Sequence, residues 1–149
     1  MNSILIRQAV LSDIEALAPL LDQYRQFYGR ESDLQAAREF LLARFNHGES
    51  VLFIAYEAGE PAGFVQLYPS FSTASLARTF ILNDLFVSEN CRRKKVGALL
   101  LEAAADFAKS LGAVRLTLST ALTNKPAQAL YESAGWKRDE QFIVYHYAI

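Results

Sequence analysis

The chain has 149 residues, of which 52% are hydrophobic and 21% charged, and its formal net charge is −1. That length is typical of one ordinary domain, and the composition allows a packed core without disulfides or metals. A near-neutral total argues against bulk nucleic-acid binding, which depends on many phosphate contacts from basic residues.

Three further observations bear on the compartment. Cys91 is the single cysteine, so no intramolecular disulfide can form, which is typical of a reducing compartment. Residues 1–10 are too short and too polar for a signal peptide. No apolar run approaches the roughly 20 residues of a membrane span. We therefore expect a soluble cytoplasmic protein with no membrane partner.

The first half of the chain predicts a strand, two helices and a hairpin. Ser12 and Glu15 form a capping-box pattern for the first helix, and Pro19 predicts a kink or break inside it. Turn residues at 58–61 separate two β-rich runs. The expected elements are a strand at 4–9, helices at 12–28 and from 32 to 45 or 46, and strands at 51–56 and 63–68.

The second half predicts alternating strands and helices. The expected elements are a strand at 78–87, a helix at 96–111, a strand at 114–119, a helix at 126–134 and an alternating last strand at 141–149. The order is therefore β-α-α-β-β-β-α-β-α-β. No linker or repeat interrupts it, so we expect one mixed α/β domain over residues 1–149, with helices flanking a mostly antiparallel sheet.

The turn between the strand at 78–87 and the helix at 96–111 is the most informative stretch. Four consecutive cations, Arg92 to Lys95, precede a first helical turn that contains Gly97 and Ala98. A helix N-terminus presents unpaired N–H groups and the positive end of the helix dipole, and small residues let a phosphate approach. This turn is predicted to bind a pyrophosphate. A solvated basic patch is the alternative interpretation.

Two blocks resemble the GNAT superfamily of acetyl-CoA-dependent N-acetyltransferases. Residues 92–97 match its phosphate loop at Gly97, although Lys95 occupies a position where glycine is common. The second block has Asn124, Ala127 and Tyr131 followed by Gly135-Trp136, at the spacing of the family's closing motif. The strand Asn83 to Val87 looks most like that of the polyamine and small-amine acetyltransferases. It differs from them at Asn83, where glutamate is common in those enzymes.

The resemblance implies a GNAT-like fold with acetyl-CoA as cosubstrate and no metal. The strand before the phosphate loop would splay from its neighbour and pair with the pantetheine arm. Asn124 would contact that arm from the other side. The residues implied to bind acetyl-CoA are Leu85, Phe86, Val87, Arg92, Arg93, Lys94, Lys95, Val96, Gly97, Ala98, Asn124, Ala127 and Tyr131.

Tyr131 and Asp84 are the predicted catalytic residues. A phenol with a pKa of about 10 is protonated at neutral pH, so Tyr131 can protonate the departing thiolate. Asp84 could take a proton from the amine through water, or attract a cationic substrate. The alternatives are a tyrosine that packs on a helix face and a carboxylate that is solvated or caps a bulge.

The expected activity is acetyl transfer to a primary amine of a small molecule or peptide, by direct attack in a ternary complex. Tyr24 and Tyr28, together with Asp84, are candidate substrate residues, and core packing is the alternative for Tyr24. There are two competing functions. One is a non-catalytic acyl-CoA-binding sensor or regulatory module, and the other is a nucleotide- or RNA-binding domain. The apolar segment 142–149 suggests a homodimer.

Overall fold

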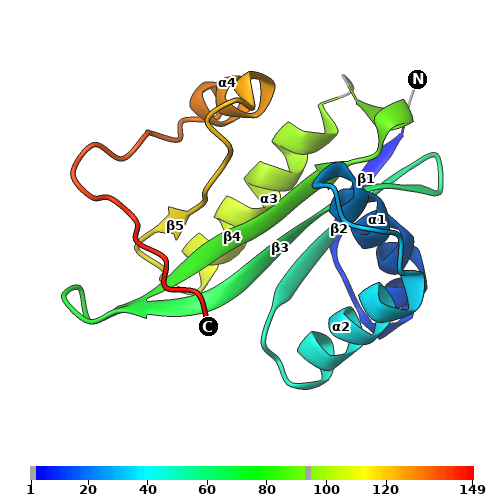
Figure 1. Cartoon of the computed structure of the whole chain (residues 1–149), viewed down its shortest axis with the longest axis horizontal. Coiled ribbons are helices and arrows are strands. Elements are labelled where there is room, and N and C mark those ends of the chain that lie inside the picture. Colours follow the sequence, from blue (N-terminus) through cyan, green and yellow to red (C-terminus); the bar gives the residue numbers. More distant parts are fainter. Residues whose placement is uncertain (1–2, 93–94) are drawn as a thin grey trace. The chain divides into compact units, whose positions relative to one another are not determined.

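The computed structural model describes residues 3–92 and 95–149 and divides into two compact units, residues 1–119 and 120–149. The first unit contains the sheet and three of the longer helices (Figure 1). The second contains one helix. Each unit is described separately.

The described part of the first unit forms a five-stranded mixed sheet in the order β1-β2-β3-β4-β5. The first four strands pair antiparallel, and β5 runs parallel to β4. This confirms the predicted mixed α/β class. The strands are β1 (Ile4–Gln8), β2 (Val51–Glu57), β3 (Glu60–Ser72), β4 (Ala77–Val87) and β5 (Leu116–Thr117).

The predicted hairpin is confirmed as β2 and β3. Ala58 and Gly59 connect the strands, with φ angles of 50° and 84°. Both residues are therefore left-handed, as in the two-residue turns whose twist matches that of the flanking strands.

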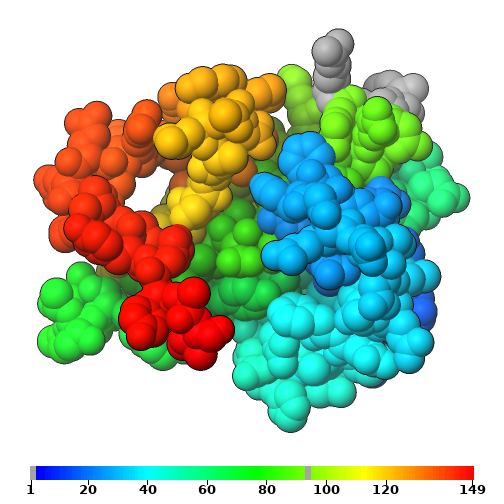
Figure 2. All heavy atoms as spheres, in the orientation of Figure 1, coloured from blue at the N-terminus to red at the C-terminus, as the bar shows by residue number. Residues whose placement is uncertain are grey.

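Helices cover both faces of this sheet (Figure 1). Helices α1 (Ile14–Phe27) and α2 (Leu34–Asn46) lie on one face, where Leu52 and Ile54 of β2 join their core. Helix α3 (Val96–Ser110) lies on the other, where Phe53 packs on Phe107 with ring centroids 5.7 Å apart. In Figure 2 the atoms of α1 and α2 form a continuous layer over their side of this unit.

The start of α1 differs from the predicted capping box. A short 3₁₀ turn, η1 (Leu11–Asp13), precedes the helix, and Asp13 rather than Ser12 is the polar anchor. Its carboxylate accepts from the Val10 N–H at 2.8 Å, from Tyr56 at 2.9 Å and from both terminal nitrogens of Arg7. Burial by itself would raise the pKa of Asp13, but these hydrogen bonds together lower it. The helix continues through Pro19.

The predicted strand at 78–87 is observed as β4, and it contains a bulge. Leu67 pairs with Leu82 and Gln66 pairs with Asp84, so Asn83 is an extra residue in β4. Phe80 packs against Phe107 of α3, with ring centroids 5.7 Å apart. Phe86 lies on the opposite face. The bulge therefore turns the end of β4 toward α1.

In the second unit, α4 (Lys125–Ser133) is close to the predicted helix at 126–134. The prediction of a last strand at 141–149 was wrong: these residues form no strand and are exposed in the structure. Alternating apolar residues favour a strand only if a neighbouring strand supplies hydrogen bonds, and this segment has none. The strand predicted at 114–119 is also shorter, because β5 pairs with β4 at only two positions.

Candidate active site

One edge of β4 is open in the first unit. In the part of this unit that the structure describes, β5 pairs with β4 only at Phe80 and Ile81. Beyond them the backbone groups of Leu85, one of the residues predicted to meet a pantetheine arm, face away from β3, whereas the carbonyl of Phe86, also predicted there, lies against Gly63 of β3. The Val87 carbonyl, also predicted there, accepts a hydrogen bond of 3.1 Å from Arg92 Nε. The guanidinium of Arg92 lies 5.9 Å from the Phe86 ring.

The predicted phosphate turn leads directly into α3. Lys95 is its N-cap residue but provides no side-chain cap, and no acidic residue lies in the first turn of α3. The helix dipole is therefore uncompensated by the described residues there, which include Val96, Gly97 and Ala98. Arg93 and Lys94, predicted to bind the same phosphates, lie outside the described residues.

Lys95 adopts the left-handed conformation that glycine would take without strain. Its φ is 66° and its ψ is 15°. The exposed side chain projects from a position where glycine is common in the family that the sequence resembles. The chain thus accepts backbone strain at this position and gains a cation beside the helix N-terminus.

Asp84 is the centre of a buried polar cluster on the α1 face of the sheet. Its side chain is 7% exposed. One carboxylate oxygen accepts from Gln66 Nε2 at 2.8 Å and the other from Asn83 Nδ2 at 3.0 Å. Gln66 is its cross-strand neighbour on β3. Tyr24 also makes a side-chain hydrogen bond with Asp84. A carboxylate can accept about four hydrogen bonds, so these three leave room for one further donor.

Burial and the nearby Asp84 carboxylate raise the pKa values of two tyrosines. Burial raises the pKa of Tyr24, and the Asp84 carboxylate raises it further. Burial also raises the pKa of Tyr68, to about 12, again with a contribution from Asp84. Tyr24 packs on Phe64 and Phe86, with ring centroids 6.0 Å away in each pair.

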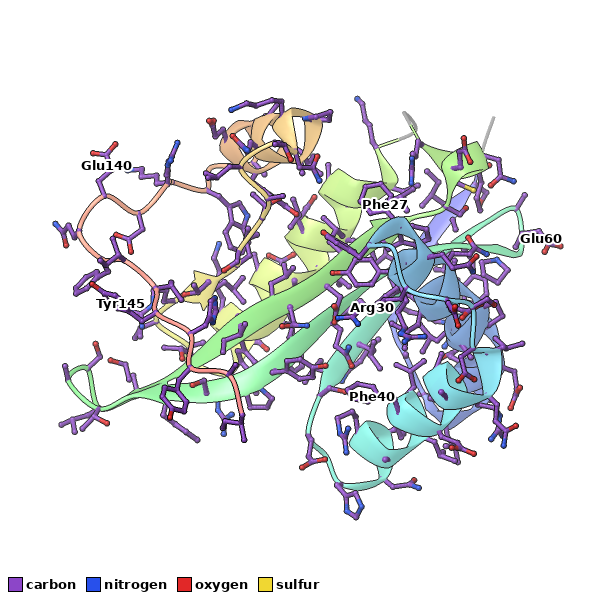
Figure 3. All side chains as sticks on the ribbon, viewed as in Figure 1. Phe27, Arg30, Phe40, Glu60, Glu140 and Tyr145 are labelled. Carbon is purple, nitrogen blue, oxygen red and sulfur yellow. The ribbon has the colours of Figure 1, made fainter. Side chains whose placement is uncertain are left out.

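No basic side chain is found within 4.0 Å of Asp84 in the ranges 3–92 and 95–149. A buried charge is costly unless a partner compensates it. Figure 3 shows Phe27, Arg30 and Phe40 on the same side of the sheet, contributed by α1, the α1–α2 loop and α2. The neighbours of Asp84 itself are Tyr24 and Tyr68, and a buried carboxyl group beside aromatic rings suits a cationic ligand.

Sequence reasoning singled out Asp84 and Tyr24 but missed Gln66 and Tyr68. A glutamine inside the apolar run 63–68 was the available signal, because a buried polar side chain in a strand requires a partner. Its partner became evident only from the pairing of β3 with β4. Tyr28, the other predicted substrate residue, is 54% exposed and stacks edge-on against Tyr24.

The loop after α1 is held by a second buried carboxylate. Asp22 accepts from Ser32 Oγ at 2.6 Å and from the Asp33 N–H at 2.7 Å. The hydrogen bond from Ser32 is the largest cause of a lowered pKa for Asp22. Asp33 in turn caps α2 through the Ala36 N–H. The Asp22 carboxylate thus fixes the loop that follows Tyr28.

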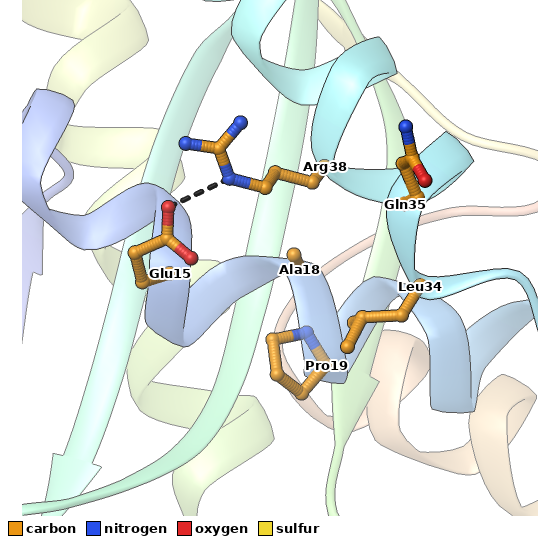
Figure 4. Close-up of a pocket in the computed structure, with 6 residues that line it drawn as sticks. All are labelled: Glu15, Ala18, Pro19, Leu34, Gln35 and Arg38. Atoms are coloured by element: carbon orange, nitrogen blue, oxygen red, sulfur yellow. Dashed lines mark hydrogen bonds and ion pairs between the residues drawn. The ribbon is translucent and has the colours of Figure 1, made fainter.

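A surface groove of about 350 Å³ lies between α1 and α2 (Figure 4). None of the predicted site residues lines it. The ion pair between Glu15 and Arg38, 2.7 Å long, borders it and is largely exposed, so it adds little stability. The lining residues are Glu15, Ala18, Pro19, Leu34, Gln35 and Arg38.

In the second unit, the predicted residues belong to α4 and its cap. Asn124 Oδ1 accepts from the Ala127 N–H at 3.2 Å, which caps the helix. Tyr131 is half-buried, and its ring lies 6.2 Å from that of Trp136. The spacing of Asn124, Ala127 and Tyr131 places them on one side of α4.

The described residues contain neither a membrane-spanning helix nor a cluster of metal ligands. None of their helices is long and apolar enough to cross a bilayer. They also contain no group of three or more His, Cys, Asp or Glu side chains that could hold a metal ion.

Comparison with known proteins shows that the chain is an acyltransferase. Residues 15–136 match the acetyltransferase (GNAT) family. An uncharacterized N-acetyltransferase of Bacillus subtilis, YhfO, is 52% identical over 140 residues, which are 94% of each chain. A probable acetyltransferase of Haemophilus influenzae is 38% identical over 129 residues, 84% of each.

A crystal structure of a probable acetyltransferase superimposes with a TM-score of 0.92 at 44% identity, covering 97% of each chain. The chain belongs to the GNAT acetyltransferase family. The family match extends across both compact units.

Proposed function

We propose that this protein transfers an acetyl group from acetyl-CoA to a primary amine of a small molecule or peptide. The observation that carries the acceptor half is Asp84: a buried carboxylate, beside two tyrosines, with no cationic partner among the residues described. A primary ammonium group supplies the missing charge and the missing hydrogen-bond donor.

The donor half rests on β4 and α3. The open β4 edge at Leu85 offers backbone groups to a pantetheine arm, and the N-terminus of α3 with Lys95 offers cationic character to a diphosphate. A distant aminoglycoside N-acetyltransferase, 18% identical with a TM-score of 0.84, was crystallised with CoA. At that identity it supports the fold, and the fold is compatible with this cosubstrate.

When bound, acetyl-CoA supplies the acetyl group; transfer forms a C–N bond, breaks the C–S bond and releases CoA and a proton. Asp84 holds the ammonium group, and the proton that the amine must lose before attack passes to Asp84 or to water. A backbone N–H on the open β4 edge polarises the acetyl carbonyl. Tyr131 donates its phenolic proton to the departing sulfur.

The acceptor amine belongs to a small molecule in several relatives. A Caenorhabditis elegans relative, 27% identical over 122 residues, is a thialysine N-epsilon-acetyltransferase. Its named substrate has a side-chain primary amine, which the Asp84 environment would suit. A non-catalytic acyl-CoA sensor is not favoured, because a sensor has no need of a buried carboxylate that lacks a cationic partner among the described residues.

The test is CoA release from acetyl-CoA across a panel of amino acids, polyamines, aminoglycosides and peptides. We expect Tyr131→Phe to lower kcat at least tenfold with little change in acetyl-CoA affinity, and Tyr147→Phe, at an exposed tyrosine, to have no effect. We expect Asp84→Asn to lower kcat/KM for the amine about 100-fold, and Asp106→Asn on the surface of α3 to have no effect. Absence of transfer to every amine, with acetyl-CoA bound, would refute the proposal.

A further inference from the structure

One buried polar atom on the face that carries Asp84 has no hydrogen-bond partner. Gln66 is 1% exposed, and its Oε1 accepts no hydrogen bond from any described residue. Buried amide oxygens in folded proteins almost always have a donor. The unpartnered oxygen is therefore a feature that the fold alone does not explain.

The orientation of this amide is fixed by Asp84. Gln66 Nε2 donates to the Asp84 carboxylate at 2.8 Å, and a carboxylate can only accept. Exchanging the nitrogen and oxygen of Gln66 would place two acceptors against each other. Oε1, the other terminal atom of the same amide, must then face away from this hydrogen bond.

The two acceptors together form a site for a group with several donors. Asp84 supplies a negative charge and an open acceptor position, and Gln66 supplies a neutral acceptor beside it. A primary ammonium group has three N–H donors and one positive charge. It can therefore satisfy the carboxylate and the amide oxygen at the same time, which a single-donor group cannot do.

We propose that Gln66 determines amine specificity: its Oε1 accepts one N–H of the substrate ammonium while Asp84 accepts another. This inference rests on the proposed function and adds a requirement to it. The amine loses one proton before it attacks, so an attacking primary amine keeps two N–H donors, one for each acceptor. An N-methyl amine then keeps only one N–H, which leaves Oε1 buried and unpaired. The enzyme then discriminates primary from secondary amines through Gln66.

The experiment compares two acceptors: the primary amine with the highest rate in the panel, and its N-methyl analogue. Hydrogen bonds to charged groups are worth roughly 10- to 100-fold in affinity. We expect Gln66→Met, which keeps the size and removes the amide, to lower kcat/KM for the primary amine at least tenfold. For the N-methyl amine kcat/KM, and for acetyl-CoA KM, should change less than threefold, so the selectivity between the two amines falls about tenfold.

Gln35→Met on the exposed side of α2 is the matched control and should leave the selectivity unchanged. Equal losses for both amines, or no loss for either, would overturn the proposal, because a merely structural role cannot distinguish a methyl group on the substrate. Such a result leaves the Asp84→Asn and Tyr131→Phe outcomes standing, so the two proposals fail separately.

A second variant covers the case in which Gln66→Met does not fold. Gln66→Glu keeps an acceptor oxygen, and a proton shared between the two neighbouring carboxyl groups replaces the lost N–H donor to Asp84. We expect it to retain the preference of the wild type for the primary amine, even if the overall rate falls. Loss of that preference in a folded Gln66→Glu protein would also overturn the proposal.

Discussion

Lys95 offers a test in which backbone strain and charge are separated by choosing the substituted residue. A left-handed conformation costs a residue with a Cβ about 1–2 kcal/mol, and glycine avoids this cost. Glycine also gains about 0.4–1 kcal/mol of unfolded-state entropy, which offsets part of the benefit. Because Lys95 has a φ of 66°, we expect Lys95→Gly to be more stable than Lys95→Ala by about 0.5–1 kcal/mol.

Thermal unfolding without ligand measures the strain, and the expected difference in Tm is about 1–4 °C for a chain of this size. Both variants lose the same exposed cation, so both should bind acetyl-CoA several-fold more weakly, and the gap to the wild type should shrink as salt is added. The reasoning about strain is refuted if the alanine variant is as stable as the glycine variant. The reasoning about charge is refuted if acetyl-CoA affinity does not change at low salt.

Three more outcomes follow from the structure. Asp84→Asn should lower the pKa of Tyr68 from about 12, yet leave it above the ordinary value because burial persists. NMR titration of labelled tyrosine measures this pKa, and an unchanged value would contradict the electrostatic interaction between Asp84 and Tyr68. Asp13 and Asp22 have lowered pKa values, so their contribution to stability is complete above about pH 4 and is lost as the pH falls through the folded-state values. In acid denaturation, Asp22→Asn should therefore weaken the dependence of the unfolding free energy on pH. Gly63→Ala places a Cβ 2.5 Å from a backbone oxygen of β4, so denaturant unfolding should show a loss of about 1–3 kcal/mol.

The sequence predicted those elements whose signals are local. The turn residues at 58–59 require left-handed backbone and produced the expected hairpin. The long apolar periodicity of 96–111 produced α3 within one residue of its predicted end. The capping pattern at Ser12 was misleading, because the adjacent Asp13 has partners on β1 and β2 that lie outside the local window. Long-range partners decide between two local candidates of similar strength.

The site was only partly predictable for the same reason. Asp84 was recognisable from its place in a strand that precedes a basic turn, but Gln66 and Tyr68 acquire their roles from the pairing of β3 with β4. Alternation along the strand would also place Phe80, Leu82, Asp84 and Phe86 on one face. The structure divides them, since Phe80 packs on α3 and Phe86 packs on Tyr24 of α1. A bulge leaves no reliable pattern in a single sequence.

That bulge explains how one short segment can serve both halves of the proposed reaction. By adding Asn83, it turns the Asp84 side chain toward the α1 face, while the backbone of Leu85 remains on the open edge of β4. Leu85 is the residue after Asp84, which is about 3.4 Å along a strand. An amine held by Asp84 would therefore lie within a few ångströms of an acetyl carbonyl polarised on that edge. The distance between the reacting groups is then set by strand geometry rather than by flexible side chains, and this is the kind of preorganisation that direct transfer requires.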